Sequence, residues 1–573
     1  MPRDPWREVL DEAESLRTRA ALSLKIPPIS VPWEEPDESL GDLAFGCFVY
    51  GKRMLQAPES IASRLAPAFS KGRFIAGASA AGGYVNLRVD ATTLATETLR
   101  AVGETGETYG RGDPQKERIL LEHTSVNPTG PIHVGRARNP IIGDSLARIL
   151  RFAGHPVTTE YLVNDVGKQM VLMYWGVTRL TPEQVGPADS EKEDHTLLPY
   201  YVKANELAEK DARVGQEVDA LIRRFEGGDA ELTREISNVS RRVLSGSLQT
   251  LERIRVGFDG FFWESELILQ GKVPPVVNRL ANLPDARQEN GAYFIDMAPY
   301  GVKGRETKWF ITKSDGTSLY PTRDIAYHLD KFSRCDVAIT VLGENHRLEF
   351  EQLRTALRLL GEREPEAVFY SYVVLPEGAM SARRGRVVTM DDLIEEAVSR
   401  ALDEVRSRRP ELPEARMREI AETVGIASLR YNIVRVQPEK KITFRWEEAL
   451  NFEGNSAPFL QYAHARTCGI LNKAGGLEPY DPARLTHPQE ARLVKVLSKL
   501  PNTVQRAAAD RRPHEIAGFA YTVASQFNLF YRDCPVLTAD PPIRAARLAL
   551  VDATRVVLQN ALECLGLPAP REM

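Results

Sequence analysis

Four consecutive residues, His133 to Arg136, combine groups that suit phosphate chemistry. They follow a turn rich in proline and glycine, with a strand pattern before it over 118–125 and an amphipathic helical pattern after it over 141–154. The first turn of a helix presents unpaired N–H groups and a positive dipole end, and Gly135 lets a nucleotide approach the backbone closely. The pattern predicts a phosphate site, although a single histidine before a glycine is more often structural.

The elements around this turn predict the sheet that positions it. A second strand pattern covers 156–165, and strand, helix and strand in about 45 residues form a βαβ unit of a parallel, doubly wound sheet. Asp165, Gly167 and Gln169 come after this strand, at the carboxyl edge where such sheets bind ligands, so they are expected to line the same crevice. The alternative is an ordinary polar turn. Further strand patterns cover 291–297, 308–313, 336–342 and 367–375.

The flanking sequence predicts a multidomain protein with an α/β Rossmann-type catalytic core. An N-terminal α+β domain is expected over 1–112, with helices over 41–55 and 59–69 and a strand over 82–89. The catalytic domain is expected over 113–440, with a charged helical insertion at about 182–256 between the halves of its sheet. Helical patterns predict an all-α bundle over 441–573.

Composition narrows the class of protein without choosing a partner. Of the 573 residues, 43% are hydrophobic and 27% are charged. We see no apolar run near the roughly 18 residues that a membrane span needs and no secretion leader, so we expect a cytoplasmic protein that uses no membrane. Five dispersed cysteines without a CxxC pair predict free thiols and no structural metal. The net charge of -4 decides nothing about nucleic acid.

The segment from Glu122 to Asp144 resembles the HIGH signature of class I aminoacyl-tRNA synthetases, in the arginine-specific form of archaeal type. The likeness to the arginyl-tRNA synthetase family continues in order through 163–169, 320–331 and 375–385, and it extends to 82–87 and 547–573. It implies an N-terminal domain that touches the tRNA elbow, a Rossmann-type catalytic domain and a helical anticodon-binding domain.

The resemblance also implies a reaction. ATP, L-arginine and tRNA(Arg) would give AMP, diphosphate and L-arginyl-tRNA(Arg) through an arginyl-adenylate. Such chemistry depends on positioning and charge stabilisation rather than on an obligatory general base. Magnesium is expected to enter with ATP, held by phosphates and water, so no protein metal ligands are predicted. A monomer is expected, and the family usually needs tRNA before it activates arginine.

The family pattern assigns the substrate sites residue by residue. The ATP site maps onto Pro131, His133, Gly135, Arg136, Asp165, Gly167 and Gln169. The arginine site maps onto Glu122, Ser125, Asn127, Tyr320, Asp324 and His346. Asp324 with Tyr320 would hold the guanidinium, since carboxylates pair best with its forked donors. Without the family, Tyr320 would be interpreted as a core aromatic and Asp324 as a helix N-terminal acid.

Two motifs depart from the family pattern. Arg136 replaces the second histidine of the signature, and the loop that usually reads Lys-Met-Ser-Lys-Ser has Met380 and Ser381 but lacks the first lysine. The position of a compensating lysine is Gly130. We expect Arg136 to bind ATP phosphate or ribose oxygens, and Arg383 and Arg384 to act on the leaving pyrophosphate, because arginine keeps its charge. The alternative for the loop arginines is a solvated basic turn.

Three residues are expected to touch tRNA. Tyr462 and Arg466 lie on one helical stretch, and unpaired bases are read by stacking on aromatic and guanidinium planes. Asn86 matches a family position that contacts the tRNA D-loop.

Two other functions compete with an active arginine enzyme. A catalytically silent paralogue that still binds tRNA would explain the altered signature and loop. A lysine-specific synthetase is the nearest chemical competitor. The set Glu122, Asn127, Tyr320 and Asp324 argues against the silent paralogue, which has no need for an amino-acid pocket. The paired acids and the arginyl-type ends of the chain disfavour a synthetase for another amino acid.

Overall fold

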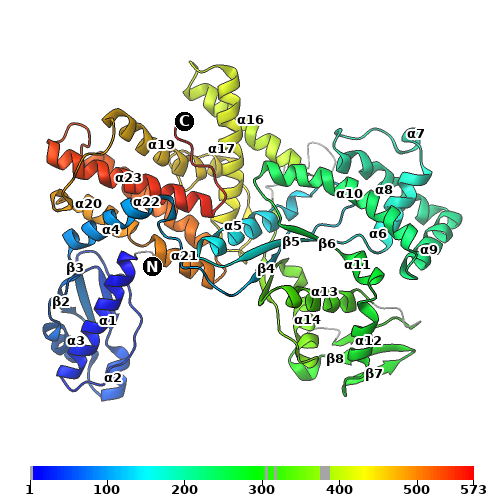
Figure 1. Cartoon of the computed structure of the whole chain (residues 1–573), viewed down its shortest axis with the longest axis horizontal. Helices are drawn as coiled ribbons and strands as arrows, with labels where there is room; N and C mark the ends of the chain where they lie inside the picture. Colours follow the sequence, from blue (N-terminus) through cyan, green and yellow to red (C-terminus); the bar gives the residue numbers. More distant parts are fainter. Residues whose placement is uncertain (1–3, 304–306, 315–318, 375–387) are drawn as a thin grey trace.

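The N-terminal module pairs helices with a small antiparallel sheet (Figure 1). The computed structural model describes residues 4–303, 307–314, 319–374 and 388–573. The module comprises α1 (Pro5–Ser23), β1 (Leu43–Gly46), α2 (Phe48–Met54), α3 (Pro58–Leu65), β2 (Ile75–Ala81), β3 (Tyr84–Val89) and α4 (Ala91–Thr105). The predicted helix over 41–55 was half wrong, because its first part is β1. These four residues pair with β3 instead, and Gly41 before them lets the chain pass close to β3, since a Cβ there would lie 2.7 Å from the Leu87 carbonyl oxygen.

The catalytic core is a five-stranded parallel sheet in the order β11-β10-β4-β5-β6. Its strands are β4 (Ile119–Glu122), β5 (Val157–Val163), β6 (Gly260–Trp263), β10 (Val337–Gly343) and β11 (Glu366–Tyr370). Its flanking helices are α5 (Arg138–Phe152), α13 (Tyr320–Arg334) and α14 (Arg347–Leu359), whereas α6 (Lys168–Arg179) packs against the helices of the insertion that follows it. The chain order reverses at β4, which lies between β5 and β10, so the crevice at the carboxyl end of β4 is the expected ligand site. The predicted doubly wound sheet is confirmed.

Two insertions interrupt this sheet. The helical insertion lies between β5 and β6, which belong to the same half of the sheet, and not between the two halves as predicted. It comprises α7 (Pro182–Val185), α8 (Glu193–Lys210), α9 (Ala212–Glu226) and α10 (Ala230–Arg253). The second comprises α11 (Glu264–Leu269), α12 (Val273–Ala281), β7 (Ala286–Glu289), β8 (Ala292–Asp296) and β9 (Lys308–Phe310). Strands predicted over 291–297 and 308–313 belong to this separate antiparallel sheet. Asn290 and Gly291, both at positive φ, form the tight turn that pairs β7 with β8.

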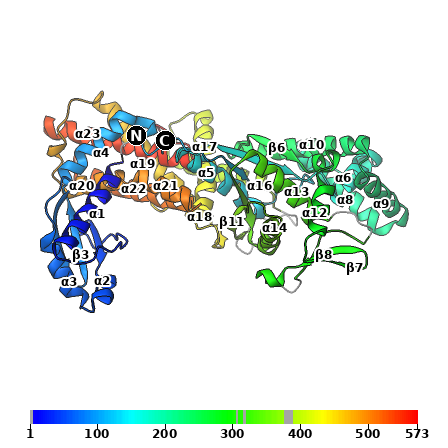
Figure 2. The same cartoon turned by 60° about the horizontal axis from the view of Figure 1, so that its bottom comes forward.

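Helices form the rest of the described chain. They are α16 (Met390–Arg408), α17 (Glu414–Val434), α18 (Trp446–Ala449), α19 (Ala457–Ala474), α20 (Pro488–Leu497), α21 (Leu500–Ala509), α22 (His514–Asp533) and α23 (Pro541–Cys564). A two-stranded pair, β12 (Val373–Val374) with β13 (Ile442–Thr443), joins them to the core. Figure 2 shows the N-terminal module and α8–α10 at opposite ends of an elongated molecule. Within the described residues, no helix is both long and apolar enough to cross a bilayer.

A buried ion pair joins the catalytic core to the helical bundle. Arg430 of α17 donates to the carboxylate of Asp144 on α5 at 2.5 Å, and both side chains are buried. The same guanidinium donates to the carbonyl oxygens of Ile254 at 2.5 Å and Leu565 at 2.9 Å. Burial alone would raise the pKa of Asp144, but Arg430 and Arg148 hold that pKa below its usual value. One arginine thus ties α5, the end of α10, α17 and the end of α23.

Removing one partner of this pair should destabilise the protein strongly. Asp144→Ala is expected to lower the free energy of unfolding by about 3–5 kcal/mol, because it leaves a buried guanidinium without its counter-ion. Replacing both residues by apolar ones, Asp144→Leu with Arg430→Met, should recover most of that loss. Urea unfolding followed by circular dichroism measures both changes.

The matched control is the exposed pair between Arg492 and Glu38. Glu38→Ala should cost no more than about 1 kcal/mol, as surface pairs do. An Asp144 variant as stable as the Glu38 variant would contradict the assignment.

Candidate functional site

The predicted phosphate turn starts α5 at the carboxyl end of β4. His133 precedes a short 3-10 turn, Val134–Arg136, that leads into α5. Its Nδ1 accepts a hydrogen bond from the Gly135 backbone N–H at 2.9 Å. The ring proton therefore lies on Nε2, and partial desolvation together with the charge of Arg136 lowers the pKa of His133. A neutral imidazole thus presents an N–H donor at an exposed position beside the start of the helix.

The backbone of this turn is paired with the start of α16. The Val134 N–H donates to the Val388 carbonyl at 3.1 Å, and the Met390 N–H donates to the Ile132 carbonyl at 2.7 Å. His133 and Thr389 form a bridge between these bonds. The turn that carries His133 is therefore held by a segment far away in sequence.

The residues predicted after β5 have different environments. Asp165 is fully buried and accepts hydrogen bonds from the Ser265 N–H at 2.9 Å and from the hydroxyls of Ser237 and Ser265 at 2.6 Å each. These bonds join the end of β5 to α10 and α11. Gly167 begins α6 at φ +97°, where nothing lies within 4 Å of a built Cβ. Gln169 accepts from the Asn127 amide at 3.0 Å, so two predicted residues meet there.

Glu122 and Ser125 lie together under the crevice. The Ser125 hydroxyl donates to Glu122 Oε1 at 2.9 Å and accepts from the Leu162 N–H at 3.1 Å. The other Glu122 oxygen forms a short ion pair with Lys331 of α13, and both side chains are buried. His346, the sixth residue of the predicted arginine site, lies just after β10. β10 is the neighbour of β4 in the sheet, so His346 lies at the same carboxyl edge as Glu122. Pro131 lies half-buried in the turn before His133.

Tyr320 and Asp324 share a small pocket at the start of α13. Its lining is Leu162, Glu264, Leu267, Tyr320, Arg323, Asp324 and Tyr327. Asp324 lies 3.2 Å from Nδ1 of His328. Burial would raise the pKa of Asp324, but His328 and Lys331 hold it below its usual value, so this acid is ionised at pH 7.

Glu264 is a site residue that the sequence analysis missed. It is 3% exposed, follows β6 directly, and accepts from Arg323 Nε at 2.6 Å inside the same pocket. Burial, reinforced by the charges of Asp165 and Asp324, outweighs Arg323 and raises the pKa of Glu264. The available signal was an acid directly after a short aromatic run, 261–263, for which the sequence analysis predicted no strand. That signal was overlooked because β6 is only four residues long.

Of the acids Glu122, Glu264 and Asp324, only Asp324 has no direct ion pair with a lysine or arginine within the described residues. Glu122 is matched by Lys331 and Glu264 by Arg323, each through a direct contact. The direct partner of Asp324 is an imidazole, which has no permanent charge. Asp324 is therefore the acid of this group that an additional cation could pair with.

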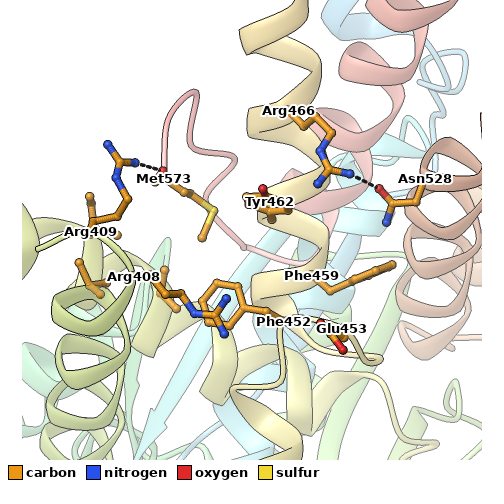
Figure 3. Close-up of a pocket in the computed structure, with 12 residues that line it drawn as sticks. Arg408, Arg409, Phe452, Glu453, Phe459, Tyr462, Arg466, Asn528 and Met573 are labelled. Atoms are coloured by element: carbon orange, nitrogen blue, oxygen red, sulfur yellow. Dashed lines mark hydrogen bonds between the residues drawn. The ribbon is translucent and has the colours of Figure 1, made fainter. Parts of the chain in front are cut away.

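Tyr462 and Arg466 line a second, larger cavity of about 630 Å³ in the helical bundle (Figure 3). The Arg466 guanidinium lies 4.6 Å from the centre of the Tyr462 ring and donates to Asn528 at 2.9 Å. The remaining lining residues are Val405, Arg408, Arg409, Ile420, Val424, Phe452, Glu453, Phe459 and Met573. An aromatic ring with an adjacent guanidinium suits a flat ligand such as a nucleobase.

Asn86 does not line either pocket. Asn86 on β3 is 2% exposed, and its amide nitrogen has no hydrogen-bond partner within the described residues. Met380, Ser381, Arg383 and Arg384 lie outside the described residues.

Comparisons with known proteins agree with this architecture. A family model described as the catalytic domain of class I tRNA synthetases (R) matches residues 99–446. Models for the arginyl-tRNA synthetase N-terminal domain and the DALR anticodon-binding domain match residues 10–89 and 460–573. The parallel sheet and its signature turn therefore define a class I aminoacyl-tRNA synthetase.

Similar proteins narrow the family. An arginine–tRNA ligase from Methanocella arvoryzae is 43% identical over 527 residues, which are 92% of each chain. One from Methanothermobacter thermautotrophicus is 40% identical over 99% of this chain and 100% of its own. The solved Thermus thermophilus arginyl-tRNA synthetase has a TM-score of 0.84 at 27% identity and covers 98% of this chain and 100% of its own. The chain belongs to the arginyl-tRNA synthetase family.

Gly135 offers a direct test of the signature turn. A Cβ added there would lie 2.9 Å from His133 Nδ1, so Gly135→Ala should push the ring away from its position. We expect ATP–pyrophosphate exchange to slow roughly ten- to hundredfold, as small misplacements of catalytic groups do, with the KM for arginine unchanged. Gly103→Ala, with open space around its Cβ on α4, is the control. Equal rates for the two variants would show that the position of His133 does not matter.

Proposed function

We propose that this chain is an arginine–tRNA ligase that activates L-arginine with ATP and transfers it to tRNA(Arg). The observation that carries the proposal is the pocket of Tyr320, Asp324 and Glu264 at the same sheet edge as His133, where the charge of Asp324 has no lysine or arginine partner among the described residues. A guanidinium cation fits that charge and can donate to two carboxylates and a hydroxyl at once.

In the proposed activation step, the arginine carboxylate attacks the α-phosphate and pyrophosphate leaves. The His133 Nε2–H, together with the positive dipole end of α5, stabilises the charge that develops on the phosphate oxygens. Arg136, exposed on the same turn, adds a permanent positive charge. ATP enters as its magnesium complex, in which phosphates and water hold the ion, so no protein ligand is assigned.

The proposed arginine site divides the substrate between two groups of residues. Asp324, Glu264 and Tyr320 hold the guanidinium. Its α-amino and carboxylate ends are assigned to polar groups along β4 and β10, which are Glu122, Ser125, Asn127 and His346. Arg323 already pairs with Glu264, so the substrate guanidinium must share or displace that contact. A lysine substrate offers fewer donors in a tetrahedral arrangement and satisfies the two acids less well.

The proposed tRNA contacts have unequal support. A base stacked on Tyr462 next to Arg466 would fill part of the cavity shown in Figure 3. Asn86 would need its cover displaced before it could reach a base, because it is buried. The roles of Arg383 and Arg384, the monomeric state and the cytoplasmic location stay predictions from the sequence.

ATP–pyrophosphate exchange tests the proposed function directly. Exchange should require arginine, should not proceed with lysine or without an amino acid, and is expected to depend on added tRNA(Arg). Exchange with lysine but not with arginine would show that the amino-acid substrate is lysine. No exchange, in a protein that still binds tRNA, would instead favour the silent paralogue.

Glu264→Gln tests the charge of the arginine pocket. The substitution keeps the shape of the side chain but removes its charge, and a hydrogen bond to a charged group is worth about 1.5–3 kcal/mol. We therefore expect the KM for arginine to rise roughly ten- to hundredfold while the KM for ATP is unchanged. Steady-state exchange at varied arginine concentration measures it. Glu266→Gln, exposed on the same helix, is the matched control, and an unchanged arginine KM in Glu264→Gln would remove Glu264 from the site.

A further inference from the structure

Asp391, in the first turn of α16, gathers three donors from the helical insertion. Its carboxylate accepts from Lys192 Nζ at 2.8 Å, His195 Nε2 at 3.0 Å and the Thr250 hydroxyl at 2.9 Å. Lys192 and His195 belong to the start of α8, and Thr250 lies near the end of α10. One carboxylate therefore fixes the start of α16 to two helices of the insertion.

The cluster is held by an internal cation. Asp194, His195 and Asp391 have ligand atoms close enough to hold a metal ion. The Lys192 ammonium already lies between the two acids, 2.8 Å from Asp391 and 3.5 Å from Asp194. Burial would raise the pKa of Asp391, but hydrogen bonds from His195 and Lys192 lower it to about 2. Asp391 is therefore ionised at all physiological pH values, and the contact is a permanent tie.

The start of α16, which Asp391 fixes to the insertion, also contacts the signature turn. Asp391 is adjacent to Met390, whose N–H donates to Ile132, and two residues after Thr389, which bridges to His133. Thr389 is itself fixed, because its hydroxyl and the Asp392 carboxylate cap α16 reciprocally. The path from the Asp391 carboxylate to the His133 backbone thus crosses one helix turn and one pair of backbone hydrogen bonds.

We propose that Asp391 is a positioning residue for the activation step, acting through the start of α16 to hold His133 at the phosphate site. The inference rests on the proposed function, because it assigns a role within the same reaction. Asp391 touches no substrate in this role. Its effect should appear in the turnover of bound substrates rather than in arginine binding, since the arginine pocket is built from β5, α11 and α13.

The test compares Asp391→Asn with Glu395→Ala in the holoenzyme reaction with tRNA present. Glu395 lies on the same helix and pairs with Arg253 of α10, so its loss breaks a second tie between the same two helices away from the signature turn. Asp391→Asn should lower kcat for pyrophosphate exchange by about tenfold or more, with the KM for arginine unchanged. Glu395→Ala should leave kcat unchanged. Rates are expressed per folded molecule, from thermal unfolding curves.

A conservative variant separates positioning from simple destabilisation. Asp391→Glu keeps the charge for Lys192 and His195 and should recover most of the lost kcat. If Asp391→Asn turned over as fast as Glu395→Ala while the wild-type enzyme was active, the positioning role would be wrong and the proposed function would stand. If the wild-type protein itself showed no exchange, the proposed function would fail first, and the positioning role would fall with it.

Discussion

The ion pair between Arg430 and Asp144 is the contact on which the arrangement of the molecule depends. Asp144 lies in the middle of α5, and α5 carries the signature turn at its N-terminal end. That end is fixed in the same way, because buried Arg138 donates to the carbonyl oxygens of Ser371 at 2.7 Å, Lys440 at 2.6 Å and Gln437 at 2.9 Å. Burial lowers the pKa of Arg138 to about 10, which still leaves it charged. Guanidinium groups therefore fix the start and the middle of the helix.

Arginine suits these junctions because its planar fork can satisfy several acceptors from different chain segments at once. A hydrophobic contact could stabilise α5 as well, but it would leave the carbonyl oxygens of Ile254 and Leu565 without the donor that Arg430 provides. Gly566 shows how closely the Arg430 site is filled, since a Cβ there would lie 2.1 Å from Arg430 Nη2. The signature turn inherits this fixed position, which matters because stabilisation of developing charge requires donors placed before the reaction.

Sequence reasoning found what local patterns determine. The parallel sheet, the turn at His133 and the helical character of the C-terminal part follow from periodicity and from glycine and proline placement. Sequence reasoning could not predict the features that depend on contacts between distant parts of the chain. Asp165, predicted to line the ATP crevice, is taken up by Ser237 and Ser265, which come from two later helices. The strand β1 was hidden because its four residues are all buried and so show no alternation.

Helix α16 extends from the signature turn to the cavity that contains Tyr462. It begins at Met390, paired with the turn of His133, and its last turn contributes Arg408 to the cavity that contains Tyr462. An α-helix rises about 1.5 Å per residue, so this one spans roughly 28 Å as a single stiff element. Packed elements of this kind move as rigid bodies, since their interfaces do not deform continuously. The proposed nucleobase cavity and the activation site therefore contact the same helix at its two ends. Because Asp391 fixes the first turn of α16, a ligand that shifts the last turn must also strain the contacts of Asp391 with the helical insertion.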